Sequence, residues 1–387
     1  GGSWGSEQSY NWELIPGPTR PDDPQTSSYT NVHYIASEDR LYNIIRVFDR
    51  TPCISYSDDW GETWNFMGRL NNITGSTTTY SNFYHKFRVH GDKIHFIGCE
   101  HHPRDFANSI YHGYIQNGKS YDSYGNELDV INDMDAPGID SYTTVWATGP
   151  VAADQYHTAW TNEIEVDENG YPVCLFQTRY GDEMYDNRAG AGDHRFFYGR
   201  FNGISWTCTE LGKLGGGMHT NEQDYTGMGC IHPDNVNIVY VSLVADPRDD
   251  TPLNHREIFK GVTSDNGLTW EWTQMTFNST EDNIRPAIPQ WDANNTAVFW
   301  TRGEYPGQED YDFVVVGMVD EEGQALTPVT YIDATVLNTT EADESAFTPT
   351  GPNGSPGAVD NQWHEYTGYG NGGSCYTAGD GGTEDAP

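Results

Sequence analysis

The sequence has few positive charges and almost no helical hydrophobic pattern. Its 387 residues include 20 Lys and Arg against 57 Asp and Glu, a formal net charge of −37, and only 5 of the cations are Lys. A nucleic-acid-binding protein gains affinity by neutralising phosphates with a basic surface, which so few cations do not provide. The same shortage argues against binding to anionic lipid. We therefore expect neither a nucleic-acid partner nor a membrane surface.

Cysteines and long apolar runs are also scarce. Six Cys in 387 residues are too few for a disulfide scaffold, and their spacing leaves room for one or two bridges without fixing a pairing. No stretch reaches the roughly 18 consecutive apolar residues of a membrane-spanning helix. Hydrophobic residues still make up 36% of the chain and aromatic residues 13%, which suffices for a folded core. We expect a secreted protein, and a monomer, since no helical stretch indicates a protein partner.

Short β-branched and aromatic runs fill much of the chain. Residues 171–178, 236–244 and 296–301 are examples, and turn residues separate such runs from one another. Asn-Gly pairs, which favour tight hairpins, occur at Asn117-Gly118, Asn169-Gly170, Asn202-Gly203 and Asn266-Gly267. The chain is therefore predicted to be all-β.

One turn motif recurs along the chain. Ser57–Trp64 (SDDWGETW) and Thr263–Trp270 (TSDNGLTW) follow the pattern S/T-x-D-x-G-x-T-W, the Asp box, and Phe201–Trp206 (FNGISW) is a degenerate copy. The Asp side chain and the Gly backbone of this motif close a turn between two strands, while the Trp packs beneath it. A second phrase, at residues 166–170 and 231–235, leads each time into an apolar strand.

Such irregular repeats, each about 40 to 65 residues long, are typical of a β-propeller with four-stranded blades. We predict a single propeller over residues 1–347 with at least five candidate blades. Residues 348–387, rich in Gly, Pro and Asn, are predicted to form a wrapped tail or the start of a linker.

Two groups of residues stand out as candidates for chemistry. Six of the thirteen His lie between residues 85 and 112, and four of the fifteen Arg lie between residues 179 and 200, beside several Tyr. In so acidic a chain, a local group of Arg, His and Tyr predicts a pocket that receives an anion. Because strands present alternate residues to opposite faces, some members of each group are equally expected in the core or in solvent.

The sequence resembles a known family in several segments. The Asp boxes, Asp193–Gly203 (DHRFFYGRFNG), Asp224–Gly227 (DYTG) and the region from Asp282 to Gly303 are similar to the BNR-repeat propeller lyases, chiefly the ulvan lyases of polysaccharide lyase families 24 and 25. The resemblance implies a secreted, seven-bladed propeller that cleaves uronic acid linkages by β-elimination, with His, Tyr and Arg in a central canyon.

The resemblance also implies roles for particular residues. The implied catalytic residues are His102, Tyr180 and Arg195. The implied substrate-binding residues are His85, His101, Tyr185 and Arg285. The doubled His leaves His101 and His102 as competitors for one position, and Tyr185 competes with Tyr180.

β-Elimination on a uronate explains why these residue types are needed together. The C5 proton is too weakly acidic while the neighbouring carboxylate is ionised, so a cation, here Arg195, has to bind that carboxylate. A base then removes the C5 proton and an acid protonates the leaving O4. The resemblance gives these two steps to Tyr180 and His102, in an order that the sequence leaves open.

A third group has the chemistry of a metal site. His219, Cys230 and His232 lie close together in sequence, and Cys-x-His on a strand places both side chains on one face. A structural zinc ion is one interpretation, and a half-buried Cys with two surface His is the other, because no fourth ligand is evident. Calcium on the many carboxylates is a further option, and no organic cofactor is expected.

Two other functions fit a propeller with Asp boxes. One is a glycoside hydrolase of the sialidase or exo-arabinanase type, using Glu163 or Glu165 with an Asp, and the other is a non-catalytic carbohydrate-binding propeller.

The strong net charge is compatible with an anionic polysaccharide as partner. Charge repulsion is screened beyond about 8 to 10 Å at moderate salt, so a local cationic pocket still attracts an anion.

Overall fold

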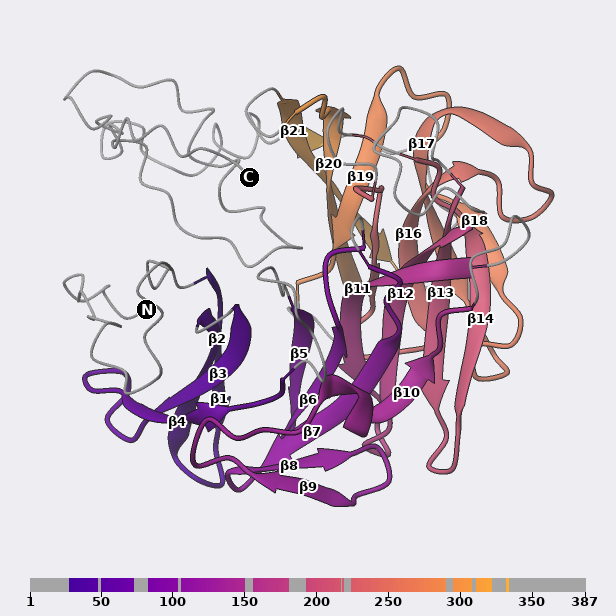
Figure 1. Cartoon of the computed structure of the whole chain (residues 1–387). Coiled ribbons are helices and arrows are strands. Elements are labelled where there is room, and N and C mark those ends of the chain that lie inside the picture. Colours follow the sequence, from indigo (N-terminus) through magenta and orange to yellow (C-terminus); the bar gives the residue numbers. More distant parts are fainter. Residues whose placement is uncertain are drawn as a thin grey trace, which may run out of the picture.

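The computed structural model describes residues 28–47, 50–72, 83–103, 106–149, 156–180, 193–216, 218, 224–289, 295–307, 311–321 and 332–333. These residues form five antiparallel sheets, each built from strands that are consecutive in sequence. The sheets follow one another around the molecule from indigo to orange (Figure 1). The described residues contain no α-helix, and none of their helical turns is long and apolar enough to cross a membrane. The predicted all-β class is confirmed.

Each sheet begins with a strand near the middle of the molecule and continues outward. The first sheet contains β1 (Ser28–Ile35), β2 (Arg40–Val47), β3 (Thr51–Ser57) and β4 (Asn65–Arg69). The second contains β5 (Tyr84–His90), β6 (Lys93–Cys99), β7 (Ile110–Gln116), β8 (Lys119–Asp122) and β9 (Glu127–Val130), with β10 (Thr143–Trp146) paired to β7 after the 3-10 turn η2 (Ile139–Ser141). The third contains β11 (Tyr156–Val166), β12 (Pro172–Tyr180), β13 (His194–Phe201) and β14 (Trp206–Lys213). The fourth contains β15 (Gly229–Ile231), β16 (Ile238–Ala245), β17 (Pro252–Val262) and β18 (Glu271–Gln274), and the fifth contains β19 (Asp282–Ala287), β20 (Asn295–Glu304), β21 (Asp312–Glu321) and β22 (Ile332–Asp333).

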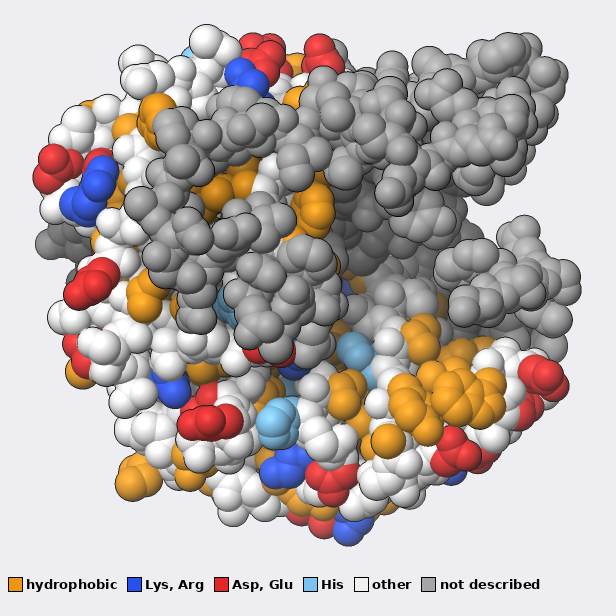
Figure 2. Space-filling model, turned by 180° about the vertical axis from the view of Figure 1, so that it is seen from behind, with side chains coloured by type: hydrophobic (Ala, Val, Ile, Leu, Met, Phe, Trp, Pro, Cys, Tyr) orange, Lys and Arg blue, Asp and Glu red, His pale blue; other side chains and the backbone are white. Residues whose placement is uncertain are grey.

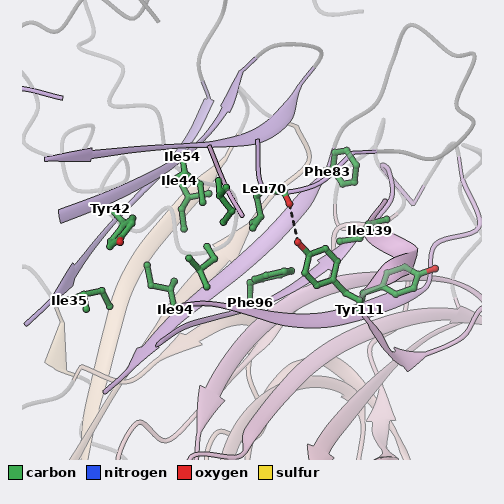
Figure 3. Packing of buried hydrophobic residues seen from close by; sticks show 13 residues of the cluster. Ile35, Tyr42, Ile44, Ile54, Leu70, Phe83, Ile94, Phe96, Tyr111 and Ile139 are labelled. Atoms are coloured by element: carbon green, nitrogen blue, oxygen red, sulfur yellow. Dashed lines mark hydrogen bonds between the residues drawn. The ribbon is translucent and has the colours of Figure 1, made fainter. Parts of the chain in front are cut away.

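The hydrophobic core lies in layers between neighbouring sheets. Figure 3 shows the first layer, in which Ile44 and Ile54 of the first sheet pack against Ile94 and Phe96 of the second. Because successive strand residues point to opposite faces, each middle sheet supplies side chains to two layers. Leu175 of β12, for example, packs toward the fourth sheet, whereas its neighbour Phe176 packs toward the second. This face-to-face stacking of sheets is the packing of propeller blades.

The three copies of the repeated turn motif occupy equivalent places, because each joins the third and fourth strands of its sheet. In the first copy, the Asp59 carboxylate accepts hydrogen bonds from the Thr63 backbone N–H and side-chain hydroxyl, at 2.9 and 2.6 Å. Asp265 accepts the same two bonds from Thr269, at 2.8 and 2.6 Å. The motif is therefore a local device that closes the outer hairpin of a sheet.

The described residues do not reach the predicted seven blades. They form five sheets, so the number of blades and the closure of the ring are not confirmed. The predicted tail at 348–387 lies outside the described residues. Cys53, Cys99, Cys174, Cys208 and Cys230 are all free thiols, so no predicted bridge forms among the described cysteines.

The second sheet buries a pair of histidines. The His95 ring stacks on His112 with centroids 5.4 Å apart, and His95 Nδ1 lies 3.2 Å from His112 Nε2. His95 Nε2 is buried without a hydrogen bond among the described residues. Burial lowers the pKa of His95 to about 3, and the charge of Lys93 acts in the same direction. The folded protein therefore holds this ring neutral at every ordinary pH.

Buried His95 is expected to make folding weaken on acidification. The unfolded ring, with a pKa near 6.5, binds a proton more tightly than the folded ring, so stability is lost as the pH falls from about 6.5 toward 3. Replacing His95 by Phe is expected to flatten the urea-unfolding free energy in that window by up to about 1.4 kcal/mol per pH unit. The exposed His90 on the same hairpin is the control, and because His90→Gln keeps His95 buried, it is expected to change the slope less than His95→Phe. Equal slopes in the wild type and His95→Phe would contradict the prediction.

Candidate functional site

The first strands of all five sheets line one cavity. β1, β5, β11, β15 and β19 each contribute residues to a space of about 460 Å³, and β11 packs between β5 and β15. Seen from behind (Figure 2), His and a few Lys or Arg side chains lie near the middle of the face. Many Asp and Glu side chains lie nearer the outline of that face. A candidate site therefore lies at the centre of the molecule.

Side chains of β5 and β11 face each other in successive pairs, and the charged ones line this cavity. Tyr84 contacts Trp160 edge to face, with ring centroids 5.2 Å apart, and Arg88 Nε lies 2.7 Å from Glu165 Oε2. Lys86 comes between the two β5 residues, and its charge interacts with that of Glu163. The two strands thus present an aromatic pair, then a Lys–Glu pair, then an Arg–Glu pair.

A β-bulge in β11 turns the side chains of Trp160 and Glu163 to the same face of the strand. The pairing of β11 with β12 skips Asn162, so that Thr161 opposes Phe176 and Glu163 opposes the next residue, Leu175. The extra residue lets Trp160 and Glu163 face the same side, although they are three positions apart. The Asn162 side chain in turn accepts a hydrogen bond of 3.0 Å from the Gly229 backbone N–H and so ties β11 to β15.

Three charged groups of the cavity have pKa values shifted toward neutral pH. Burial lowers the pKa of Lys86 to about 8, opposed by the Glu163 charge and assisted by the Arg285 charge. Burial raises the pKa of Glu163 to about 7, although the Ile231 N–H donates a 2.6 Å hydrogen bond to its carboxylate. Burial likewise raises the pKa of Glu165 to about 8 against the effect of Arg88. Acids and bases with pKa values near the working pH are the usual agents of proton transfer.

A run of rings borders the central cavity at Arg285, which lines both that cavity and a small space beside Trp160 and Tyr225. His102 lies 5.0 Å from Trp160, Trp160 stacks on Tyr225 at 5.7 Å, and Tyr225 stacks on Tyr305 at 6.2 Å, measured between ring centroids. Arg285 ends the run, with its guanidinium carbon 5.7 Å from the Tyr305 centroid. We call these five residues the aromatic run. Flat rings with a few polar groups at their ends are typical linings of ligand pockets.

Arg285 has a left-handed backbone conformation and no carboxylate partner among the described residues. Its φ of 54° lies in the left-handed region, and its N–H donates a 2.7 Å hydrogen bond to Gly227 O. Its Nε has no hydrogen-bond partner, and no carboxylate of the described residues lies within ion-pair distance of it. Non-glycine residues held in this conformation gather at functional sites.

A buried ion cluster of Arg179, His194 and Asp224 lies next to the aromatic run. Arg179 of β12 and His194 of β13 both contact Asp224. Arg179 Nη2 lies 2.5 Å from Asp224 Oδ2, and His194 Nε2 lies 3.0 Å from Asp224 Oδ1. Burial acts to raise the pKa of Asp224, but the His194 hydrogen bond and the Arg179 charge outweigh it, so the pKa is lowered and the carboxylate stays ionised. Arg179 also donates a 3.4 Å hydrogen bond to Pro103 O. The cluster therefore fixes Tyr225, next to Asp224, and His102, next to Pro103.

Two of the residues predicted from the sequence, His102 and Arg285, lie at the ends of the aromatic run. His101 packs its ring 4.5 Å from Phe106, and so His102 is the member of the pair that meets the run. Tyr180 ends β12, and its side chain lies outside the described part of the chain, as do Tyr185 and His219.

His85 and Arg195 lie apart from the run. His85 Nε2 is 2.9 Å from the Asn71 amide nitrogen, its ring stacks on Phe87, and burial lowers its pKa to about 3. Arg195 donates to Asp193 at 2.5 Å and to Glu210 at 2.8 Å, and it lies outside the lining of the central cavity. Its charge is therefore already matched by two carboxylates.

The two described members of the predicted metal site do not fit a zinc ion. His232 Nδ1 accepts a hydrogen bond from the Asp234 N–H at 3.1 Å, and Nε2 bonds to Thr296 Oγ1 at 2.8 Å, so both nitrogens are used within the protein. Burial raises the pKa of the Cys230 thiol, which opposes the thiolate that zinc requires. Within the described ranges, no three His, Cys, Asp or Glu side chains are grouped to hold a metal ion, calcium included.

The interpretation of the sequence missed Lys86, Trp160, Tyr225 and Tyr305 as parts of the site. Lys86 had a usable signal, because it is one of only 5 Lys and alternates with Tyr84 and Arg88 along one strand. The three aromatic residues had none, since 25 Tyr and 12 Trp occur throughout the chain.

Comparison with known proteins gives a likeness in fold. No protein-family model matches the sequence, and no curated protein does. A solved structure described as an ulvan lyase of polysaccharide lyase family PL25 matches with a TM-score of 0.51 at 12% identity, over 71% of this chain and 62% of that chain. The same values hold for that enzyme bound to -[GlcA(1-4)Rha3S]-. A Trypanosoma rangeli sialidase with the inhibitor DANA matches with a TM-score of 0.43 at 11% identity, over 78% of this chain and 49% of that chain.

At this identity the likeness shows the fold alone. Together with the five stacked sheets and the cavity lined by their first strands, it places the chain among propeller-like all-β folds. The match spans less than about two thirds of the lyase chain, at 62% of its length.

Proposed function

We propose that the protein is a secreted polysaccharide lyase that cleaves an anionic, uronate-containing polysaccharide by β-elimination. The observation that carries this proposal is the aromatic run, which ends at Arg285, whose Nε has no hydrogen-bond partner among the described residues and which lines the same cavity as Lys86 and Glu163. A sugar ring would stack on the half-buried Tyr225, and Arg285 would bind the uronate carboxylate. The likeness in fold to an ulvan lyase agrees with this class of substrate.

Neutralising the carboxylate is the step that makes elimination possible, because it stabilises the charge that develops when the C5 proton leaves. Arg285 is better suited to this step than Arg195. Arg195 would have to leave Asp193 and Glu210 before it could bind a substrate carboxylate. Arg285 has no such competitor among the described residues.

A glycoside hydrolase is the second candidate, supported by Glu163 and Glu165. Both carboxyls line the cavity, and burial raises their pKa values to about 7 and about 8, as in the general acid of a hydrolase. Glu165 is held by Arg88, however, which leaves one carboxyl rather than two for chemistry.

Incubation with ulvan, glucuronan and other uronate polymers separates these functions. We expect ultraviolet absorbance to rise with time, because elimination creates a C4=C5 double bond conjugated with the carboxylate. New reducing ends without that absorbance would identify a hydrolase. Binding with neither product would identify a carbohydrate-binding propeller, and both of these outcomes would refute the lyase proposal.

A further inference from the structure

The Lys86–Glu163 pair is the part of the cavity that carbohydrate binding alone does not explain. Both side chains are partly buried and line the space of about 460 Å³, as Arg285 does. A lysine and a carboxyl kept this far from solvent are costly unless they are paired or used. Because Arg285 lines the same cavity, a uronate whose carboxylate binds Arg285 would bring its C5 and O4 toward this pair.

We propose that Lys86 is the base that removes the C5 proton and that Glu163 is the acid that protonates the leaving O4. The proposal rests on the proposed lyase function and deepens it by naming the proton-transfer pair. It differs from the roles that the family resemblance implies, in which Tyr180 and His102 exchange these protons.

Lys86 is suited to act as a base because it loses its proton more easily than an ordinary lysine. Burial and the Arg285 charge lower its pKa to about 8, so a useful fraction is the neutral amine at mildly alkaline pH. A substrate carboxylate bound to Arg285 would cancel that positive charge and raise the basicity of Lys86. The base would then become stronger only when a substrate is present.

The other titratable or charged groups of the cavity do not compete with Lys86 and Glu163 for proton transfer. The titratable or charged side chains that share it with the pair are His33 of β1, Arg88 of β5, Glu165 of β11, Cys230 of β15 and Arg285 of β19. Arg88 is held by Glu165, and burial together with the Arg88 charge lowers the pKa of His33 to about 4. His33 is therefore too weak a base to compete with Lys86 near neutral pH. The Cys230 thiol stays protonated because burial raises its pKa.

The proposed step balances without a further reactant. Neutral Lys86 Nζ takes the C5 proton, the C5–H electron pair becomes the C4=C5 double bond, and the C4–O4 bond breaks. The Glu163 carboxyl gives its proton to O4. Lys86 ends as an ammonium and Glu163 as a carboxylate, and one proton passed from the first to the second restores the starting state.

Three variants test the pair through the pH dependence of lyase activity. Lys86→Met removes the amine, Lys86→Arg keeps the charge but stays protonated, and Glu163→Gln removes the acid. We expect each to lower kcat by about 10² to 10⁴ at neutral pH, and we expect a bell-shaped profile in the wild type. Lys119→Met, on an exposed lysine of β8, is the matched control and should keep full activity. Wild-type kcat in Lys86→Arg, together with its loss in His102→Gln, would overturn the proposal in favour of the imidazole.

A second measurement needs no substrate and no variant. Competitive acylation of the native protein with trace acetic anhydride across pH, read by peptide mass spectrometry, gives a titration curve for each of the 5 Lys. We expect Lys86 to titrate at a lower pH than the other four. Titration together with the others would overturn the assignment of the base. Failure to cleave any uronate polymer would instead refute the lyase function, whatever the acylation shows.

Discussion

Replacing Asp224 by Ala is expected to lower the free energy of unfolding by about 3 to 5 kcal/mol. Asp224 is buried between Arg179 and His194, at 2.5 and 3.0 Å. Removal of its carboxylate leaves the buried Arg179 guanidinium without its counter-charge, and that desolvated charge accounts for most of the cost. Urea unfolding followed by tryptophan fluorescence measures the change.

An exposed ion pair provides the control for Asp224. Lys119 Nζ lies 2.8 Å from Glu127 with both side chains exposed, so Lys119→Met is expected to change stability far less than Asp224→Ala. The double variant Arg179→Met, Asp224→Leu should recover part of the loss, because it removes both charges at once. A loss of under about 1 kcal/mol in Asp224→Ala would mean that the cluster does not hold this region together.

The second large effect concerns activity. Arg285→Met is expected to lower kcat/KM on a uronate polymer by about 10² to 10³, because it removes the charge that stabilises the developing anion. The thermal midpoint should change little, since Arg285 makes no ion pair with the described residues. Arg285→Lys should restore part of the activity, because it returns the charge without the planar fork.

Arg195→Met is the matched comparison for Arg285→Met. Arg195 bonds to Asp193 and Glu210, so its loss should affect local stability more than elimination. If Arg195→Met abolished elimination and Arg285→Met did not, the role implied by the family resemblance would stand and our assignment of Arg285 would be wrong.

Much of the fold was predictable because its signals are local. The repeated turn motif needs only hydrogen bonds between residues four positions apart, such as Asp59 with Thr63, and all three copies close the hairpin expected of them. The β-branched and aromatic runs likewise became strands, as at β12 and β16. The number of blades had no local signal, because it depends on how far the sheets rotate about one another.

The site was predictable only in part. The sequence placed His102 and Arg285 among its candidates, but it could not tell which Arg of the 179–200 group faces inward. Neighbouring strand residues point to opposite faces, and a bulge anywhere in the strand reverses that order. Arg179 is buried in the ion cluster, whereas Arg195 bonds to acids outside the cavity lining. The Trp160–Tyr225–Tyr305 stacking joins three sheets, and such long-range contacts leave no trace in spacing.

The additional residue at Asn162 has a consequence for how relatives of this chain should be recognised. Without it, Glu163 and Glu165 would turn to the opposite face of β11 while Trp160 kept its place. Two sequences with the same Trp and Glu, but differing by one residue in length between them, would therefore present unlike surfaces to the cavity. In this strand, the number of residues between Trp160 and Glu163 decides which side chains face the cavity, as much as the identity of those residues does. An alignment that gives no weight to a one-residue gap there would therefore match proteins whose cavities are lined by different side chains.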